Sequence, residues 1–341
     1  MIYVNLIKEL CLLGGVSGFE DNVRNFILSE ISEYVDECKV DNLGNIIAFK
    51  KGKQRAKNKL MMCAHMDEVG LIVTHVTEDG YLGFSTVGGI DVKILHGIAV
   101  NVVNSKVKGV IGIKPIHLTQ GKEKNTPLKA DNLFIDIGAN NKEDALKNVN
   151  VGDFVTFNSV FEESSDSIIS KALDDRAGCS ILINIIKGSI EFDTYFVFTV
   201  QEEIGLIGAK VASYGVNPDC AVVVETTTAC DLPSVEESKK VCKLGEGAVI
   251  SFMDKGTIYD KSLYNLCLST AKENNIPVQI KKAVAGGNDS GAIHCSREGV
   301  KTIAISIPCR YLHSPEGIIF KSDYSAVNDL AKTMISKINE I

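Results

Sequence analysis

The chain has 341 residues, of which 45% are hydrophobic and 23% charged, a composition typical of a globular protein with room for two domains. Its formal net charge of -7 argues against nucleic-acid and anionic-membrane partners, because both require clustered Lys and Arg. The first 20 residues lack a cationic leader followed by an uninterrupted apolar run, and no run approaches the ~18 apolar residues of a membrane helix. The ten cysteines form no C-x-x-C pair, which favours reduced thiols and a cytoplasmic location.

The first predicted elements are those of an α/β protein. Apolar residues at helical spacing predict an amphipathic helix over residues 19–35. The segment KLMMCAH, residues 59–65, is continuously apolar, as parallel strands covered on both faces are. We therefore expect a buried strand that ends at His65.

The pattern changes between about residues 73 and 163. Short alternating segments divided by glycines replace the long apolar runs, and helical spacing returns only over residues 141–148. These segments cover residues 80–89, 97–114, 133–139 and 152–161. They predict a small β domain, a barrel or a PDZ-like fold, inserted into the α/β domain.

After the insertion the α/β pattern resumes. Buried strands are predicted over residues 194–200, 221–227 and 302–308, and helices over 175–188, 261–275 and 322–341. We expect a mostly parallel sheet sandwiched by helices. The predicted domains are a catalytic α/β domain, residues 1–72 and 164–341, and an inserted β domain for dimerisation and oligomerisation, residues 73–163.

Acidic residues recur next to the predicted strands. His65 and Asp67 lie on one side of an extended segment, so the carboxylate can orient the imidazole as a metal ligand, although a histidine satisfied at a strand end has the same spacing. Asp174 and Asp175 precede a helix that begins near Arg176, where either a cation or the helix N-terminus would offset their charge. Each pattern alone also has a purely structural explanation.

Five residues at or just after predicted strand ends, or in the loops there, form a stronger signal. They are His65, Asp174, Glu203, Glu225 and His313. Open α/β sheets place their sites at the carboxyl ends of strands. Two imidazoles and three carboxylates suit a pair of divalent ions with one bridging carboxylate, so the sequence predicts a dinuclear metal site.

Several motifs occur in order along nearly the whole chain. They are VSGFE (16–20), AHMDEVG (64–70), VGGIDVKILHG (87–97), LFIDIGA (133–139), KALDDRAG (171–178), VQEEIGLIGA (200–209), GGNDSGAIH (286–294) and RYLHSPEG (310–317). Together they resemble the tetrahedral aminopeptidases, metallopeptidase family forty-two. That family includes glutamyl aminopeptidases and proteins once labelled endoglucanase or cellulase M.

The resemblance implies a role for each predicted site residue. One divalent ion would lie between His65, Asp174 and Glu225, and a second between Asp174, Glu203 and His313, so that Asp174 bridges them. Asp67 would orient His65. Glu202 would be the general base for the attacking water.

The resemblance further implies a co-catalytic aminopeptidase that acts on peptides. Zn or Co would be the activating ions, and a dodecameric tetrahedral shell would be built from dimers through the inserted domain. The position of Glu225 is often aspartate in this family, so the longer side chain puts the metal preference, rather than metal binding, in question.

Other candidate residues carry weaker signals. Asp289 follows a family loop and either shapes the substrate pocket or belongs to a plain turn. The histidines without ligand spacing are expected to be structural, namely His75, His96, His117 and His294. Cys63, Cys179 and Cys309 lie near proposed ligands but are expected to act as small apolar residues.

Two rival functions remain for comparison. A carboxypeptidase or amidohydrolase of the related family uses the same five ligands, but its small domain is inserted late in the chain, whereas here it falls between His65 and Asp174. A glycoside hydrolase needs two carboxylates that face one bond. Glu202 and Glu203 are expected to point to opposite faces of a strand, and the chain has no Trp to stack on sugars.

Overall fold

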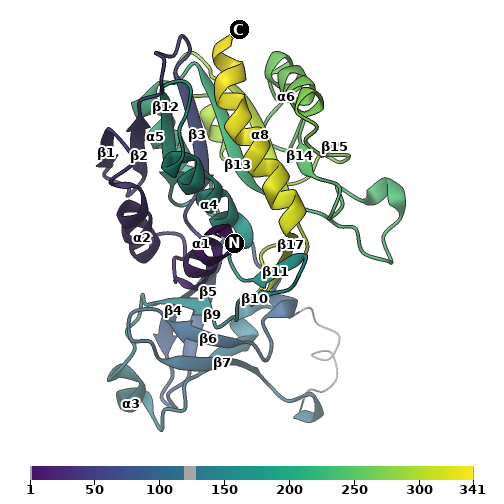
Figure 1. The fold of residues 1–341 in the computed structure, drawn as a ribbon. Helices are drawn as coiled ribbons and strands as arrows, with labels where there is room; N and C mark the ends of the chain where they lie inside the picture. The colour runs from purple at the N-terminus through teal and green to yellow at the C-terminus, as the bar shows by residue number, and fades with distance from the viewer. Residues whose placement is uncertain (1, 119–127, 341) are drawn as a thin grey trace.

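The computed structural model describes residues 2–118 and 128–340, which form an α/β part and a separate barrel joined end to end (Figure 1). The barrel lies below the α/β part in this view, and the C-terminus lies at the opposite end of the molecule. None of the described helices combines the length and the apolar character that a membrane crossing requires.

A mixed sheet forms the centre of the α/β part. In the described chain it has eight strands in the order β1-β2-β12-β3-β13-β16-β14-β15. Their bounds are β1 Glu37–Val40, β2 Ile46–Lys50, β3 Leu60–His65, β12 Thr194–Thr199, β13 Cys220–Thr228, β14 Ala248–Ile250, β15 Val278–Ile280 and β16 Lys301–Cys309. The central strands β12, β3, β13 and β16 pair in parallel, whereas β2 and β14 run antiparallel to their central neighbours. The four predicted strands are therefore confirmed, and the antiparallel strands make the sheet mixed.

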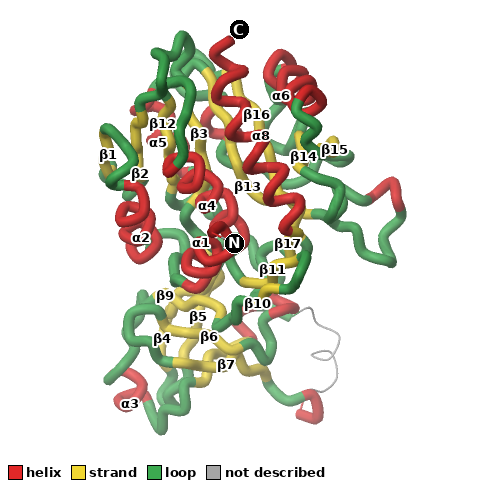
Figure 2. The backbone as a smooth tube through the Cα atoms, viewed as in Figure 1, coloured by secondary structure: helices red, strands yellow, loops and turns green. Residues whose placement is uncertain are grey.

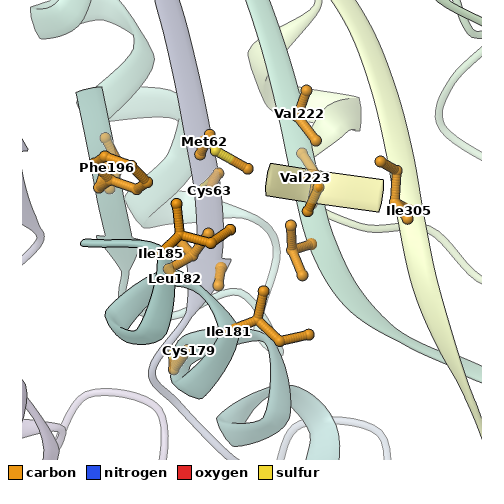
Figure 3. Packing of buried hydrophobic residues seen from close by; sticks show 14 of the residues in the cluster. Met62, Cys63, Cys179, Ile181, Leu182, Ile185, Phe196, Val222, Val223 and Ile305 are labelled. Carbon is orange, nitrogen blue, oxygen red and sulfur yellow. The ribbon is translucent and has the colours of Figure 1, made fainter. Parts of the chain in front are cut away.

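Helices cover the sheet and bury its apolar side chains. Their bounds are α1 Ile2–Leu12, α2 Asp21–Ile31, α4 Leu173–Lys187, α5 Ile207–Val216, α6 Lys261–Glu273, α7 Ser290–Ile293 and α8 Lys321–Glu340. In Figure 3, Ile181, Leu182 and Ile185 of α4 point toward β3 and the neighbouring strands, where Met62 and Phe196 lie. Burying such side chains contributes about 1.5–3 kcal/mol each, which fixes α4 and its first turn against the strand ends.

The inserted segment closes into a barrel. Within the described residues its strands follow the order β4-β5-β8-β7-β6-β9. The bounds are β4 Gly70–Val76, β5 Leu82–Val87, β6 Ala99–Val102, β7 Lys108–Ile113, β8 Leu133–Asp136 and β9 Phe154–Phe157, with one short helix, α3, Lys142–Leu146. Figure 2 shows this part as mainly strand and loop. The barrel has its own apolar core, separate from that of the α/β part, as independent domains do.

A small sheet and a buried ion network lie where the two parts meet. The sheet pairs β10 Glu162–Glu163, β11 Ser167–Ser170 and β17 Gly317–Phe320. Glu68 accepts from Lys171 Nζ at 2.7 and 2.8 Å and from the backbone N–H of Gly15 at 3.0 Å. Arg176, also buried, donates to the carbonyl oxygen of Leu10 at 2.7 Å. These contacts join the N-terminal segment, the start of the barrel and the start of α4.

Candidate metal centre

One open cavity of about 580 Å³ brings the predicted site residues together. Its lining includes His65, Asp174, Glu202, Glu203, Glu225 and His313. His65 ends β3, whereas Glu225 lies inside β13, three residues before that strand ends. Glu203 follows β12, and His313 follows β16. The carboxyl ends of neighbouring parallel strands meet at this edge of the sheet, which is why residues so far apart in sequence share one cavity.

Asp174 lies at the centre of this group. Its Oδ1 is 3.3 Å from His65 Nε2, and its Oδ2 is 3.5 Å from His313 Nε2. His313 Nε2 also lies 3.2 Å from Glu203 Oε2. Ligand atoms of His65, Asp174 and Glu203 all lie within 4.8 Å of one another. Asp174 thus offers one oxygen to each histidine, the arrangement that a bridging carboxylate requires.

Both histidines are held through the ring nitrogen that faces away from Asp174. His65 Nδ1 is 3.2 Å from the carbonyl oxygen of Asp67 and 3.5 Å from its Oδ1. His313 Nδ1 donates to the carbonyl oxygen of Gly89 at 2.9 Å. Because these acceptors require the proton on Nδ1, Nε2 of each ring faces the cavity, and it offers a lone pair to a metal once its own proton is lost. Metal-binding histidines are oriented in this way.

Asp67 is fully buried and organises both glutamates as well as His65. Its Oδ1 accepts from the backbone N–H of Glu202 at 3.0 Å, and its Oδ2 accepts from that of Glu203 at 3.1 Å. Ser17 Oγ donates to the same Oδ2 at 2.6 Å. One carboxylate therefore fixes the turn after β12 and the ring of His65.

The expectation that Glu202 and Glu203 point to opposite faces is wrong. Strand β12 ends at Thr199, and Gln201 has a left-handed φ of 56°. The chain is therefore no longer extended at the two glutamates, and strand alternation does not apply. Both side chains line the same cavity. Only Glu203 contacts His313, whereas the Glu202 carboxylate makes no hydrogen bond or ion pair within residues 2–118 and 128–340.

Glu225 lies slightly apart from the central group. Its Oε1 accepts from Asn288 Nδ2 at 2.8 Å and from Ser306 Oγ at 3.1 Å. Burial raises the pKa of Glu225 to about 8; the positive charge of Lys281 opposes this rise, and the negative charge of Asp174 adds to it. The side chain is positioned on the cavity wall by neutral donors that leave its other oxygen available.

The remaining acids share the same electrostatic environment. Burial raises the pKa of Glu202 well above its usual value, with His65 opposing the rise and Asp289 adding to it. Burial also raises the pKa of Glu203. For Asp174 burial acts in the same direction, but the contacts with His313 and His65 outweigh it and lower the pKa. A cation in this cavity would relieve the repulsion among these carboxylates.

The weaker candidates lie outside the cavity lining. Asp289 is buried and accepts from Thr199 Oγ1 at 2.6 Å, and Cys63 Sγ lies 3.5 Å from the same oxygen. Burial raises the pKa of Asp289 to about 6. In the described chain, none of His75, His96, His117 and His294 lines the cavity. Cys63, Cys179 and Cys309 are buried, and burial raises the pKa of each thiol.

Sequence reasoning gave no role to several residues that support the site. Ser17 and Gly89 lie in the motifs VSGFE and VGGIDVKILHG, and Asn288 lies in GGNDSGAIH. The motifs marked these segments as important, but their partners are far away in the sequence. Gly89 and His313, for example, are 224 positions apart.

Comparison with known proteins supports the interpretation of this geometry. Residues 44–330 match the family model described as M42 glutamyl aminopeptidase. The chain belongs to the M42 peptidase family. A relative from Acetivibrio thermocellus is 41% identical over 336 residues, with 98% of each chain covered. The lysyl aminopeptidase of Pyrococcus furiosus is 33% identical to this chain. The alignment covers 99% of this chain and 98% of that protein.

Solved structures similar to this chain share its whole fold. A TET aminopeptidase from a marine-sediment thaumarchaeote superposes with a TM-score of 0.94 at 33% identity, covering 99% of this chain and 97% of that one. The TET1 peptidase of Pyrococcus horikoshii, described as assembling into a tetrahedron or a large octahedral shell, has a TM-score of 0.86 at 34% identity, with 98% and 99% covered. A Thermotoga maritima protein described as an endoglucanase has a TM-score of 0.82 at 41% identity, with 98% of each chain covered. As an M42 member, this chain is a peptide hydrolase of the metal-dependent aminopeptidase class.

Proposed function

We propose that this M42 member is a dinuclear-metal aminopeptidase that removes N-terminal residues from peptides. The observation that supports this most strongly is the position of Asp174, whose two oxygens face the Nε2 atoms of His65 and His313. A single carboxylate between two oriented imidazoles fits a site for two ions. The donors present are nitrogen and carboxylate oxygen, which suit Zn or Co.

The residues divide into ligands and supporting groups. His65, Asp174 and Glu225 would hold one ion, and Asp174, Glu203 and His313 the other. Bound divalent ions would lower the pKa of the attacking water and polarise the scissile carbonyl. Asn288 and Ser306 would keep Glu225 in place through the hydrogen bonds that they donate to its Oε1. Asp67 would keep the ring of His65 in the tautomer that binds metal.

Glu202 would move the proton. Its carboxylate lines the cavity without a partner among the described residues, and its raised pKa suits a group that takes a proton from water and gives it to the leaving amine. The backbone N–H of Glu202 is fixed by Asp67 at 3.0 Å, so the base is held at its main chain while its side chain stays available.

The barrel would serve assembly. We propose that residues 73–163 form the dimerisation and oligomerisation domain, and that residues 1–72 and 164–341 form the catalytic domain. The barrel's separate core and the tetrahedral assembly of the related TET1 peptidase support this division. A dodecamer built from dimers is the expected particle, and the cytoplasmic location predicted from the cysteines stays a prediction.

Metal removal tests the proposed function. Dialysis against a chelator should abolish hydrolysis of aminoacyl p-nitroanilides, and Zn, Co or Mn should restore it, because without bound ions Glu202 would act on a water whose pKa is not lowered. Elemental analysis of the reconstituted protein should give two ions per subunit. Full activity in a sample shown to be free of metal would overturn the proposal.

Substrate comparison separates the two rivals. One structural relative is described as an endoglucanase, so carboxymethylcellulose should be assayed beside the peptides. N-terminally acetylated peptides test the carboxypeptidase alternative, because an acetyl group blocks an aminopeptidase and leaves a carboxypeptidase unaffected. We expect hydrolysis only of peptides with a free N-terminus.

A further inference from the structure

Side chains of distant segments accept hydrogen bonds from every backbone N–H of residues 200–203. In the order of these donors, the acceptors are Asn45 at 3.0 Å, Glu20 at 3.2 Å, and the two oxygens of Asp67 at 3.0 and 3.1 Å. Residues 200–203 lead from β12 into the cavity, so these acceptors decide the course of the backbone that carries Glu202. The proposed function uses Asp67 but neither Asn45 nor Glu20.

Gln201 is the residue of this turn whose conformation most needs support. Its φ of 56° lies in the left-handed region, which residues other than glycine rarely occupy. Such a conformation persists only where surrounding contacts hold it. Glu202 follows directly, so the backbone angles of Gln201 decide the direction in which the proposed base leaves the strand. The hydrogen bond that Gln201 donates to Glu20 is therefore well placed to control the base.

Glu20 is 3% exposed, and its carboxylate serves this turn rather than its own helix. It precedes α2, yet within residues 2–118 and 128–340 its side chain makes no capping hydrogen bond to that helix. Its Oε1 also accepts from the backbone N–H of Gly18 at 2.7 Å, so one oxygen joins two segments 181 positions apart. Burial raises the pKa of Glu20 to about 7, with the N–H of Gly18 opposing the rise. A neutral carboxyl group still offers an acceptor oxygen, so these bonds do not require the charge.

The segment that carries Glu20 is itself fixed against the inserted barrel. The backbone N–H of Ser17 donates to the carbonyl oxygen of Glu68, just before β4, at 3.2 Å. The ring of Phe19 stacks on that of Phe154 in β9, with the ring centroids 5.4 Å apart and the planes at 22°. These contacts give Glu20 a firm base from which to hold the turn.

We propose that Glu20 is a positioning residue for Glu202: it holds the backbone of Gln201 in the left-handed conformation that directs the proposed base into the cavity. This inference rests on the proposed aminopeptidase function and adds a residue that need not touch substrate or metal. The length of the side chain, rather than its charge, is the property that matters, because Oε1 has to reach the N–H of Gln201.

Three substitutions separate length from charge. Glu20→Gln keeps the length and one acceptor oxygen, so it should keep most of the wild-type kcat. Glu20→Asp keeps the charge but is one methylene shorter, and Glu20→Met keeps the length without an acceptor. Both should lower kcat for Leu-p-nitroanilide by about 10- to 100-fold, as the loss of a supporting hydrogen bond does. KM should change little, because the proposed base acts in the transition state.

Metal content and backbone exchange give readouts that do not depend on turnover. Elemental analysis should still find two ions per subunit in all three variants, because Asp67 holds the N–H of Glu203 independently. Before metal is added, hydrogen–deuterium exchange at the amide of Gln201 should be about 10- to 100-fold faster in Glu20→Asp and Glu20→Met, and unchanged in Glu20→Gln. Unchanged exchange in Glu20→Met would overturn the proposal.

Ile27→Ala is the matched control for a general loss of stability. Ile27 is fully buried in α2, so its truncation leaves a cavity in the core but removes no acceptor from the turn. It should lower the urea midpoint and leave kcat at the wild-type value. If Ile27→Ala lowers kcat as much as Glu20→Met does, Glu20 acts only through overall stability and the proposal is wrong.

The outcomes separate this inference from the proposed function. If the wild-type protein cleaves no aminoacyl substrate with any metal, the proposed function is wrong. If the wild-type protein is active and Glu20→Asp keeps kcat while Glu20→Gln loses it, charge rather than length is decisive, and only this inference is wrong. Loss of an ion in Glu20→Met would place the effect on Glu203 instead of Glu202 and would also overturn it.

Discussion

The ring of His313 donates from Nδ1 to the carbonyl oxygen of Gly89 across 2.9 Å. His313 follows the central strand β16, whereas Gly89 belongs to the turn that follows β5 of the barrel. The inserted domain therefore orients a proposed metal ligand of the α/β domain. Gly89 therefore links the barrel, the proposed assembly domain, to the geometry of the proposed metal centre.

The Gly88–Gly89 turn offers a test of this contact. Gly88 has a φ of +83°, and a Cβ added there would lie 2.8 Å from Val69 Cγ1 and 3.3 Å from the Cβ of Glu203. Gly88→Ala should therefore displace the turn and lower metal affinity by about 10- to 100-fold, as loss of a ligand's supporting hydrogen bond does. Titration calorimetry of the metal-free protein with Zn measures this.

Gly89→Ala is the matched control for that variant. A Cβ at Gly89 would make only an ordinary contact, 3.5 Å from His313 Nδ1. It should change metal affinity much less than Gly88→Ala. Equal affinity losses in the two variants would show that the carbonyl contact does not orient His313.

The two neighbouring glutamates should respond differently to amide substitution. Glu202→Gln removes the proposed base but no ligand, so it should lower kcat by about 10²- to 10⁴-fold while two ions stay bound. Glu203→Gln alters a side chain whose Oε2 lies 3.2 Å from His313 Nε2, so it should lower occupancy toward one ion per subunit. Elemental analysis beside kcat measures both effects. If Glu202→Gln lost metal while Glu203→Gln kept two ions and full rate, the two roles would be reversed. If both variants stayed fully active, the pair would be ordinary solvated acids with no role in catalysis.

The buried pair of Lys171 and Glu68 should be important for stability. Burial lowers the pKa of Lys171, and the negative charge of Glu68 opposes this shift. Lys171→Met leaves the buried Glu68 carboxylate with weaker compensation, and such losses typically cost about 3–5 kcal/mol of unfolding free energy. Urea denaturation of the metal-free protein measures this.

Lys142→Met is the comparison, because Lys142 pairs with Glu78 at 2.8 Å on an exposed surface. Water already solvates that pair, so its removal should change the urea midpoint little. If the two variants shift the urea midpoint equally, the buried pair contributes no more to stability than the exposed pair does.

Deleting the barrel should separate assembly from folding. A protein in which a short linker replaces residues 75–162 should keep the secondary structure of the α/β part, seen by circular dichroism, and should no longer form a large particle in light scattering. It should also be inactive, because Gly89 no longer supports His313. A deleted protein that still elutes as a large assembly would refute the assembly role.

The central strands and most ligand candidates were predictable from sequence for a local reason. Parallel strands covered on both faces are continuously apolar, so residues 59–65, 194–200, 221–227 and 302–308 stood out without any knowledge of their neighbours. Open α/β sheets place their sites at the carboxyl ends of these strands, so the polar residues that follow each strand could be picked out as ligand candidates. The strands β1, β2, β14 and β15 are short. Pairing with the distant strands β12 and β16 places β2 and β14, and β1 and β15 pair with these two strands in turn.

Tertiary structure alone decided how the site is oriented. The left-handed φ of Gln201 turns both Glu202 and Glu203 into one cavity, which strand alternation does not predict. The hydrogen bond between Asn288 and Glu225 joins residues 63 positions apart in the sequence, and the one between His313 and Gly89 joins residues 224 positions apart. Residue type and periodicity are local properties that determine which strands form and which ligand atoms exist, whereas hydrogen-bond partners and burial depend on segments that only the folded chain brings together.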